Sequence, residues 1–337
     1  MKGKLLATLL LSAVAGSAVA QQQPQFSHYA FNGMYLNPAY AGIKGQGEIT
    51  AIGRYQYFGY NGTIDRGGSP KTYALTANLP VLAIGGGVGV SIYRDEIAKS
   101  EITSASLSYS KHFKVGDEGR FGVGIQGIYN NWHRNGDYRY VDPYDPNIPA
   151  NSSDSKFDAG AGVWYESPRW YAGLSLTNLL RSKYSFESVP DANNQSQGRQ
   201  ATATAENHGY LSVGYNFDVT DNIVVTPTAI GKLVFPGKFG DGKKFSFDNN
   251  SFEVGARATL DDRFWGGLGY RYQESLTGML GAAVLKDNVL RIGYAFDWIA
   301  FNQQARAFSS HEIMLSYRLP KPGLAVRPAI RTPRYSF

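Results

Sequence analysis

The sequence predicts an all-β fold, a transmembrane antiparallel β-barrel of about fourteen strands. Three observations predict it: polar and apolar residues alternate along most of the chain, long and short connections alternate between these segments, and aromatic residues gather at segment ends. The barrel is expected over residues 48–319. A signal peptide (1–20) and an aromatic segment (21–47) precede it, and a basic, proline-rich tail (320–337) follows it.

The first twenty residues have the organisation of a secretory signal peptide. Lys2 and Lys4 form a basic start, residues 5–14 are apolar, and the small residues 18–20 form a cleavage site before Gln21. The apolar run is too short for a membrane helix, which needs about twenty residues, so a retained N-terminal anchor is disfavoured. We therefore expect export through a cleaved signal peptide and a location in the outer membrane.

The composition of the remaining chain favours a barrel. No other segment has the continuous apolar length of a membrane helix, so a membrane protein of this sequence has to cross as a closed barrel. Gly (39) and Tyr (23) are abundant and Cys is absent, so disulfides cannot stabilise the fold. Without Lys2 and Lys4 the chain has 31 basic and 27 acidic side chains, a net charge of about +4. Nucleic acid is not an expected partner, because the chain is exported and has no basic-aromatic motif.

Alternation with period two is the main signal, because successive side chains of a strand point to opposite faces of a sheet. Ala105, Leu107 and Tyr109, for example, alternate with serines. Fourteen segments of this kind are expected, over 49–57, 72–79, 84–93, 104–110, 120–130, 157–165, 170–178, 208–217, 223–233, 251–260, 264–272, 276–285, 289–297 and 311–319. A soluble sandwich also alternates, but most segments here have the nine to eleven residues of a membrane strand, and their polar face is rich in Gly, Ser, Thr and Asn.

The connections predict the direction of the barrel in the membrane. Tight turns are expected at 80–83, 166–169, 218–222, 261–263 and 286–288, and long loops at 131–156, 179–207, 234–250 and 298–310. Outer-membrane barrels have short periplasmic turns and long external loops. An even number of strands then places both termini in the periplasm.

Two features interrupt the pattern. Pro227 lies inside a predicted strand, where it removes a ladder hydrogen bond and predicts a bulge or a shorter strand. The glycine run 85–87 permits a close backbone approach or a kink. It does not indicate a phosphate loop, because no helix, Lys or Ser/Thr follows at the required spacing.

The sequence does not indicate an enzyme, a cofactor or a metal site. The five histidines, His28, His112, His133, His208 and His311, form no zinc-binding pattern, and no nucleophile motif is present. His311 is flanked by a serine and a glutamate, but neighbouring residues in a strand point to opposite faces and cannot form a relay. Residues 142–147 contain acidic groups that could bind calcium weakly, although a rigid polar loop is the favoured interpretation.

The two irregular ends are candidate binding elements. Residues 21–47 form an aromatic segment with a turn at Asn37 and Pro38, interpreted either as a plug against the barrel wall or as a docking element for a periplasmic partner. The tail is either an extended basic docking strip or a disordered end. The candidate partner-binding residues are Phe26, Tyr29, Asn37, Pro38, Tyr40, Lys321, Arg327, Arg331 and Arg334.

Both ends of the mature chain resemble one family. Residues 25–29 with 37–42, and the closing segment 310–318, resemble the PorP/SprF family of outer-membrane proteins of type IX secretion in Bacteroidota. The resemblance covers nearly the whole mature chain and implies a barrel without catalytic residues that works with the secretion and gliding machinery. It also implies partners: periplasmic secretion components, and large secreted surface proteins such as adhesins, often held through their C-terminal domains. The tail beyond Leu319 is longer than is usual in the family.

Two functions therefore remain open. The first is a non-enzymatic barrel in the outer-membrane lipid that anchors a secreted surface protein or helps to export it. The second is a passive porin-like channel or transporter for small solutes, with a conducting lumen lined by charged side chains. These are Arg54, Arg120, Glu253, Arg257, Arg271 and Arg318. A paired network that fills the barrel is the favoured interpretation of these charges.

Overall fold

The structure, a computed structural model, describes residues 23–60, 68–135, 150–188, 199–235, 250–301 and 307–321, with residues 190, 193 and 237. The predicted signal peptide, the acidic loop 142–147 and most of the basic tail lie outside these residues. Among those described, no helix is long and apolar enough to cross a membrane.

The described strands form one large sheet and one small hairpin. The strands of the large sheet are β1 (Glu48–Tyr55), β2 (Lys71–Val81), β3 (Gly86–Ile97), β4 (Ser100–Val115), β5 (Gly119–Arg134), β6 (Ser152–Glu166), β7 (Trp170–Thr177), β10 (Asn207–Tyr215), β11 (Phe217–Asp218), β12 (Ile223–Phe235), β13 (Ser251–Leu260), β14 (Phe264–Arg271), β15 (Ser275–Val284), β16 (Leu290–Ile299) and β17 (Ser309–Arg318). The hairpin consists of β8 (Lys183–Glu187) and β9 (Arg199–Thr204).

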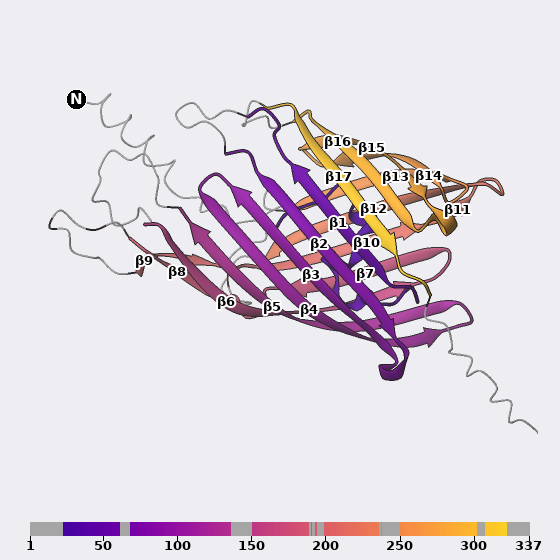
Figure 1. The fold of residues 1–337 in the computed structure, drawn as a ribbon, viewed down its shortest axis with the longest axis horizontal. Coiled ribbons are helices and arrows are strands. Elements are labelled where there is room, and N and C mark those ends of the chain that lie inside the picture. Colours follow the sequence, from indigo (N-terminus) through magenta and orange to yellow (C-terminus); the bar gives the residue numbers. More distant parts are fainter. Residues whose placement is uncertain are drawn as a thin grey trace, which may run out of the picture.

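The large sheet closes into a barrel. Consecutive strands pair antiparallel, β1 pairs with β17, and β10 pairs with both β7 and β12 across the hairpin insertion. Figure 1 shows the closure, with the yellow β17 beside the indigo β1. The two-residue β11 continues β10 after Asn216, so the barrel has fourteen strands and the predicted fold is confirmed.

Pro227 does not shorten its own strand. β12 runs through it, and Pro227 lies opposite Ala256 of β13 in an unbroken register. The break lies in the neighbouring strand, between β10 and β11, because Pro227 has no N–H to donate to the ladder. The Thr226 hydroxyl donates to the Asn216 side chain (2.9 Å) at this break.

The two faces of the barrel differ as the alternation predicts. Outward side chains are apolar and open to the surroundings, such as Leu107 and Leu268 (66% and 74% exposed), whereas the inward Ser108 on the same strand as Leu107 is buried. This pattern places hydrocarbon-compatible side chains outside and polar side chains inside.

The connections distinguish two ends of the barrel. One end, the short-turn end, has tight turns throughout, including 116–118 and the 3₁₀ helix η5 (Lys286–Asn288), and a further 3₁₀ helix, η3 (Leu82–Ile84), lies there. The other, the long-loop end, contains the long connections and the β8–β9 hairpin. Two connections there are nevertheless tight, at 98–99 and 272–274, so the alternation of loop lengths is less regular than the sequence suggested.

Candidate functional site inside the barrel

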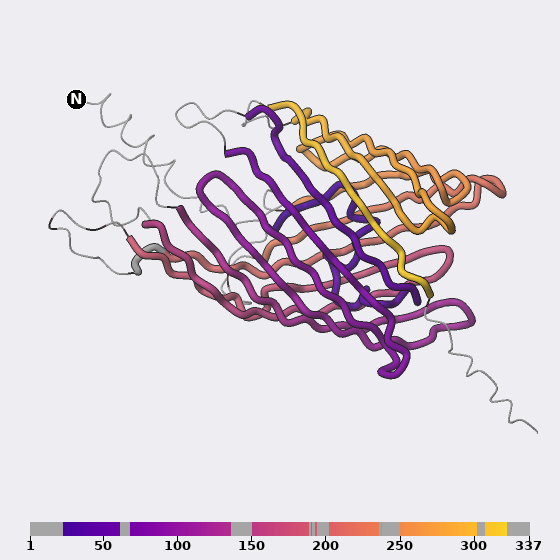
Figure 2. Tube along the Cα trace, in the orientation of Figure 1, coloured from indigo at the N-terminus to yellow at the C-terminus, as the bar shows by residue number. Residues whose placement is uncertain are grey.

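Residues 23–47, here called the luminal segment, lie inside the barrel. The segment contains η1 (Tyr29–Phe31), α2 (Gly33–Leu36) and η2 (Pro38–Tyr40). Figure 2 shows its dark indigo trace enclosed by the strands, and it ends at the short-turn end, where β1 begins. At η2, Pro38 occupies the first turn and the Asn37 side chain accepts a hydrogen bond from Ala39 N (2.9 Å).

The start of the luminal segment is fixed to the wall by a buried carboxylate, Glu312 of β17. Its two oxygens accept hydrogen bonds from the backbone N–H groups of Ser27 and His28, each at 2.8 Å. The His28 Nδ1 atom also lies 2.8 Å from Glu312 Oε1, and Arg54 Nη1 of β1 donates to Oε2 at 3.2 Å. Four contacts therefore satisfy a charge that is 1% exposed.

A second buried carboxylate, Asp297 of β16, extends this network. Arg54 Nη2 donates to Asp297 at 2.5 Å, and the hydroxyl groups of Ser27 and Thr277 donate to its other oxygen at 2.8 and 2.7 Å. Arg271 lies 4.0 Å from Asp297 and donates to Glu253 at 2.9 Å. Buried charges are tolerated when opposite charges and hydrogen bonds surround them, and the charged residues of this network come from five strands, β1, β13, β14, β16 and β17.

Hydrogen bonds between the wall and the later part of the luminal segment hold that part in place. Some run from a luminal side chain to the wall backbone, and others from wall side chains to the luminal backbone. Asn37 Nδ2 donates to the backbone oxygens of Val163 and Leu174 (2.9 and 3.1 Å), which belong to neighbouring strands. Ser175 donates to Leu36 O (2.6 Å), and Ser110 donates to Ala39 O (3.0 Å). These bonds satisfy polar groups of a non-strand segment that are shielded from water.

Glycines of the wall allow the segment to approach closely. A Cβ atom at Gly124 would lie 2.3 Å from Ala39 N, and one at Gly87 would lie 2.3 Å from Ala41 O. Any side chain at these two positions would therefore overlap the luminal backbone. The close backbone approach predicted for the 85–87 run occurs at Gly87.

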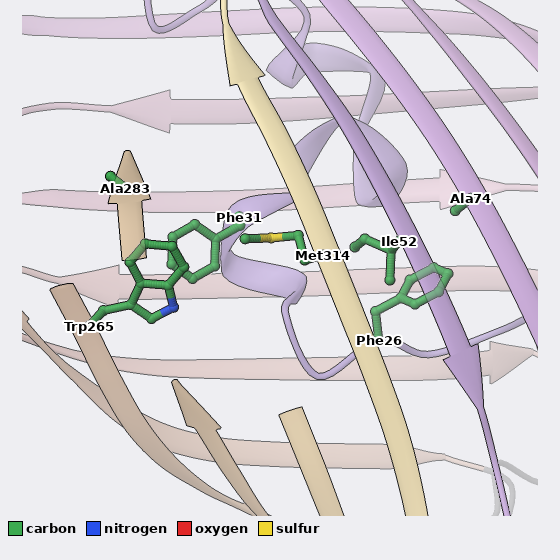
Figure 3. Close-up of a cluster of buried hydrophobic side chains, with 7 residues drawn as sticks. All are labelled: Phe26, Phe31, Ile52, Ala74, Trp265, Ala283 and Met314. Atoms are coloured by element: carbon green, nitrogen blue, oxygen red, sulfur yellow. The ribbon is translucent and has the colours of Figure 1, made fainter. Parts of the chain in front are cut away.

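Aromatic side chains fill the remaining space. Phe31 packs against Trp265 of β14 (ring centroids 5.1 Å apart), and the guanidinium of Arg257 lies 4.4 Å from the Phe31 ring centre. Figure 3 shows Phe31 with Trp265 and Phe26 with Ile52, while Met314 reaches between the two pairs. At the other end, Tyr40 packs edge-on against Trp164 (5.1 Å).

The hairpin β8–β9 extends the wall at the long-loop end. Tyr184 and Phe186 pack against Trp132 of β5, with ring centroids 5.3 and 5.4 Å away, and the Arg134 guanidinium lies 4.5 Å from the Phe186 ring. Asp154 of β6 accepts a hydrogen bond from Ser185 N (2.9 Å). Burial raises the pKa of the Tyr184 phenol to about 12, so it stays protonated at neutral pH.

Comparison with known families identifies the barrel. The sequence profile described as type IX secretion system membrane protein PorP/SprF matches residues 18–317. The chain belongs to this family. The resemblance inferred from the two ends is confirmed, and the protein is an outer-membrane β-barrel of the type IX secretion system.

Solved structures similar to this PorP/SprF protein are outer-membrane transporters and channels. The toluene transporter TbuX of Ralstonia pickettii is 13% identical, with 85% of this chain and 92% of that chain covered and a TM-score of 0.50. The toluene transporter TodX of Pseudomonas putida is 9% identical, with coverages of 89% and 95% and a TM-score of 0.45. The likeness to TbuX supports the barrel fold alone. The search of curated proteins gave no match.

The structure brings five of the predicted partner-binding residues together in the lumen of this PorP/SprF barrel. Phe26, Tyr29, Asn37, Pro38 and Tyr40 are all buried there, in contact with the wall. Lys321 is exposed at the short-turn end, and the remaining three predicted residues, Arg327, Arg331 and Arg334, lie outside the described residues. Their role in binding a partner stays a prediction.

Five of the six predicted luminal charges form ion pairs or hydrogen bonds. Besides the Arg54, Arg271 and Glu253 contacts, Arg120 donates to Ile43 O (2.9 Å) and Arg318 pairs with Asp262 (3.2 Å). The sixth, Arg257, lies over the Phe31 ring, and its Nε has no hydrogen-bond partner within the described residues. Sequence reasoning missed Glu312 and Asp297 as the groups that hold the luminal segment. Alternation placed Glu312 on the inward face, and that signal could have paired it with Arg54. Within the described residues, no group of His, Asp or Glu side chains has the arrangement of a metal site.

Proposed function

We propose that this chain is exported by a cleaved signal peptide and acts, without catalysis, as a barrel that anchors a large secreted surface protein or helps to export it. The observation that carries the proposal is the occupied lumen in a member of a type IX secretion family. A barrel filled by its own hydrogen-bonded segment offers no wide interior path. Its partners would therefore bind at its two ends.

The long-loop end is the surface proposed for the secreted partner. It carries the β8–β9 hairpin, which is packed in a fixed position by Trp132 and Asp154 and whose Lys183 is exposed. An adhesin-like partner bound through its C-terminal domain would meet this end outside the cell. The short-turn end and the basic tail, whose first basic residue is Lys321, would face periplasmic secretion components.

A photo-crosslinking experiment in intact cells tests the proposal. A photoreactive residue replaces Lys183 at the long-loop end or, as the matched control, Lys286 at the short-turn end; both side chains are exposed. We expect a large exported protein among the products from position 183 and not from position 286. Absence of both exported proteins and secretion components from all crosslinked material would contradict the proposal.

The rival function is passive transport of small solutes, for which the similar toluene transporter gives a precedent at the level of fold. The network around Glu312 and Asp297 argues against an open pore, because both carboxylates accept hydrogen bonds from the luminal segment. Single-channel recording of the purified protein separates the two functions. We expect no stable open state from the wild-type chain, and conductance from a variant that lacks residues 25–43. A stable wild-type pore for small solutes would support the channel instead.

A further inference from the structure

A small cavity lies at the long-loop end, where three parts of the chain meet. Gln23 and Pro24 of the luminal segment, the inner wall, and the hairpin around Tyr184 and Thr204 enclose about 50 Å³. A water molecule needs roughly 10–15 Å³ on the same kind of measure, so this space suits a group of a few heavy atoms. Drug-sized ligands and sugar rings need several hundred Å³ and would not fit.

Two buried acceptor atoms of the lining have no hydrogen-bond partner within the described residues, although the Asn130 side chain also interacts with the Tyr184 phenol. His208 Nδ1 lies 2.9 Å from the backbone oxygen of Glu206, which only accepts, and 3.4 Å from Asn178 Nδ2, which only donates. The shorter contact, to the oxygen, assigns the proton to Nδ1 and makes Nε2 an acceptor. Within the described part of the chain, neither His208 Nε2 nor Asn130 Oδ1 has a hydrogen-bond partner. Both side chains line the cavity and are nearly inaccessible (1% and 7% exposed). Buried acceptors of this kind are costly unless a donor reaches them.

The rest of the lining favours a positively charged donor. The carboxylate of Asp95 contributes to the cavity and receives a hydrogen bond from Thr72 on Oδ1 (2.6 Å). Tyr93, Trp132 and Tyr184 supply aromatic surface, which attracts cations. An alkylammonium group combines three donors, no acceptor and a positive charge on one small atom.

We propose that this cavity is a binding site for a primary alkylammonium group, such as the end of a lysine side chain. The group would donate to His208 Nε2, Asn130 Oδ1 and the Asp95 carboxylate. Arg181 already pairs with Glu206, so Asp95 is the carboxylate available to balance the ligand. Lys232, whose ammonium donates to Gln23 O, is near Asp95 and reduces the net attraction.

The site is also in contact with the start of the luminal segment. Gln23 lines the cavity, and Tyr210 Oη donates to the Gln23 side chain (2.6 Å). Tyr35 Oη donates to Pro24 O (2.9 Å). A bound ammonium would therefore contact the start of the luminal segment at the long-loop end.

Titration of the purified, detergent-solubilised protein with n-butylammonium tests the site, with 1-butanol as the neutral probe of similar size. Calorimetry or saturation-transfer NMR should show one site for n-butylammonium with a dissociation constant on the order of 1–10 mM, and at least about tenfold weaker binding of 1-butanol. Asp95→Asn should weaken ammonium binding about tenfold, and Asn130→Asp, which adds a carboxylate acceptor, should strengthen it about fivefold. Asp262→Asn, at the short-turn end, is the matched control and should leave binding unchanged.

A second comparison identifies the source of the ammonium. N-acetyl-lysine methylamide is compared with the norleucine analogue, which lacks the ammonium, and with free putrescine. Binding of the lysine compound assigns the site to a polypeptide side chain, and preferential binding of putrescine assigns it to free amines. Equal affinity for butylammonium and 1-butanol, no binding of any amine, or no response to Asn130→Asp would overturn the proposal and leave a water-filled cavity only. None of these measurements needs a secreted partner, so their outcome is independent of the crosslinking result.

Discussion

At the scale of single residues, the luminal segment depends on a few wall side chains that contact its backbone. Glu312 binds two successive N–H groups, at Ser27 and His28, while Arg54 joins it to Asp297. A carboxylate in this position fixes the path of the main chain and not only one side chain. This explains how a segment without strand pairing keeps a defined place inside a barrel.

Replacing Glu312 with Gln should destabilise the protein by about 3–5 kcal/mol. Arg54 and His28 would lose a buried charged partner, and the new amide N–H group would face an N–H donor that now binds a carboxylate oxygen. The free energy of unfolding, from denaturant titration in lipid vesicles, measures this change. Glu96→Gln is the control, since Glu96 pairs with Arg94 on the exposed surface and such pairs contribute about 0–1 kcal/mol. Equal effects of the two substitutions would contradict the role given to Glu312.

Gly124 and Gly127 on the same strand form a matched pair. Alanine at 124 places its Cβ against Ala39 and Pro38, whereas Gly127 has no atom within 4 Å of an added Cβ. We expect Gly124→Ala to cost about 1–3 kcal/mol and to loosen the luminal segment, and Gly127→Ala to be nearly neutral. Protease cleavage within residues 23–47 of the purified barrel reports the loosening. Resistance of both variants equal to wild type would show that the segment does not pack on Gly124.

At the scale of elements, the β8–β9 hairpin is joined to the barrel by a small aromatic cluster and a few hydrogen bonds. Its strands pair with each other and not with the main sheet. Such an element can detach without unfolding the barrel, because sub-global opening requires the loss of its own contacts alone.

Phe186→Ala removes a fully buried ring that packs against Trp132 and Arg134. The hairpin should lose roughly 3–5 kcal/mol of local stability, the usual cost of truncating a buried Phe, while the barrel keeps its global unfolding transition. Hydrogen exchange over 183–187 measures the first effect and denaturant unfolding the second. Lys183→Ala, at an exposed position, should change neither. A fall in global stability equal to the local loss would show that hairpin and barrel unfold together.

At the scale of the whole molecule, the barrel has a direction. The short-turn end contains the start of β1 and the end of β17, whose residues Glu48 and Arg318 lie opposite each other. Outer-membrane barrels have short turns in the periplasm, so the hairpin and the alkylammonium cavity are expected on the cell surface.

The absence of cysteine makes this orientation directly measurable. Lys183→Cys should react with a membrane-impermeant maleimide on intact cells. Lys286→Cys should react only after the outer membrane is permeabilised. Both positions are exposed, so a difference reports the side of the membrane rather than burial. The reverse labelling pattern would invert the proposed orientation and move the partner surface to the short-turn end.

Much of the barrel could be predicted from sequence because its determinants are local. Period-two alternation, as at Ala105 to Tyr109, reports which face of a strand meets lipid, and this needs no knowledge of distant residues. The tight turn at 98–99 was not predicted, because the expected segments 84–93 and 104–110 left ten residues between them. The expected segments 264–272 and 276–285, by contrast, already implied a short connection near 272–274. The prediction that Pro227 bulges or shortens its own strand was wrong, because the break lies in the neighbouring strand, opposite the missing N–H.

The sequence by itself determined the strand pattern, the family and the inward placement of Arg54 and Glu312. Tertiary structure alone decided that Ser27 and His28 meet Glu312 and Asp297, which are some 270 to 285 residues away in the chain. It also decided that Gly87 and Gly124 accommodate the backbone of the luminal segment, and that His208 and Asn130 share one cavity. The physical reason is barrel closure, which brings the last strand beside the first and surrounds the luminal segment with strands from the whole chain.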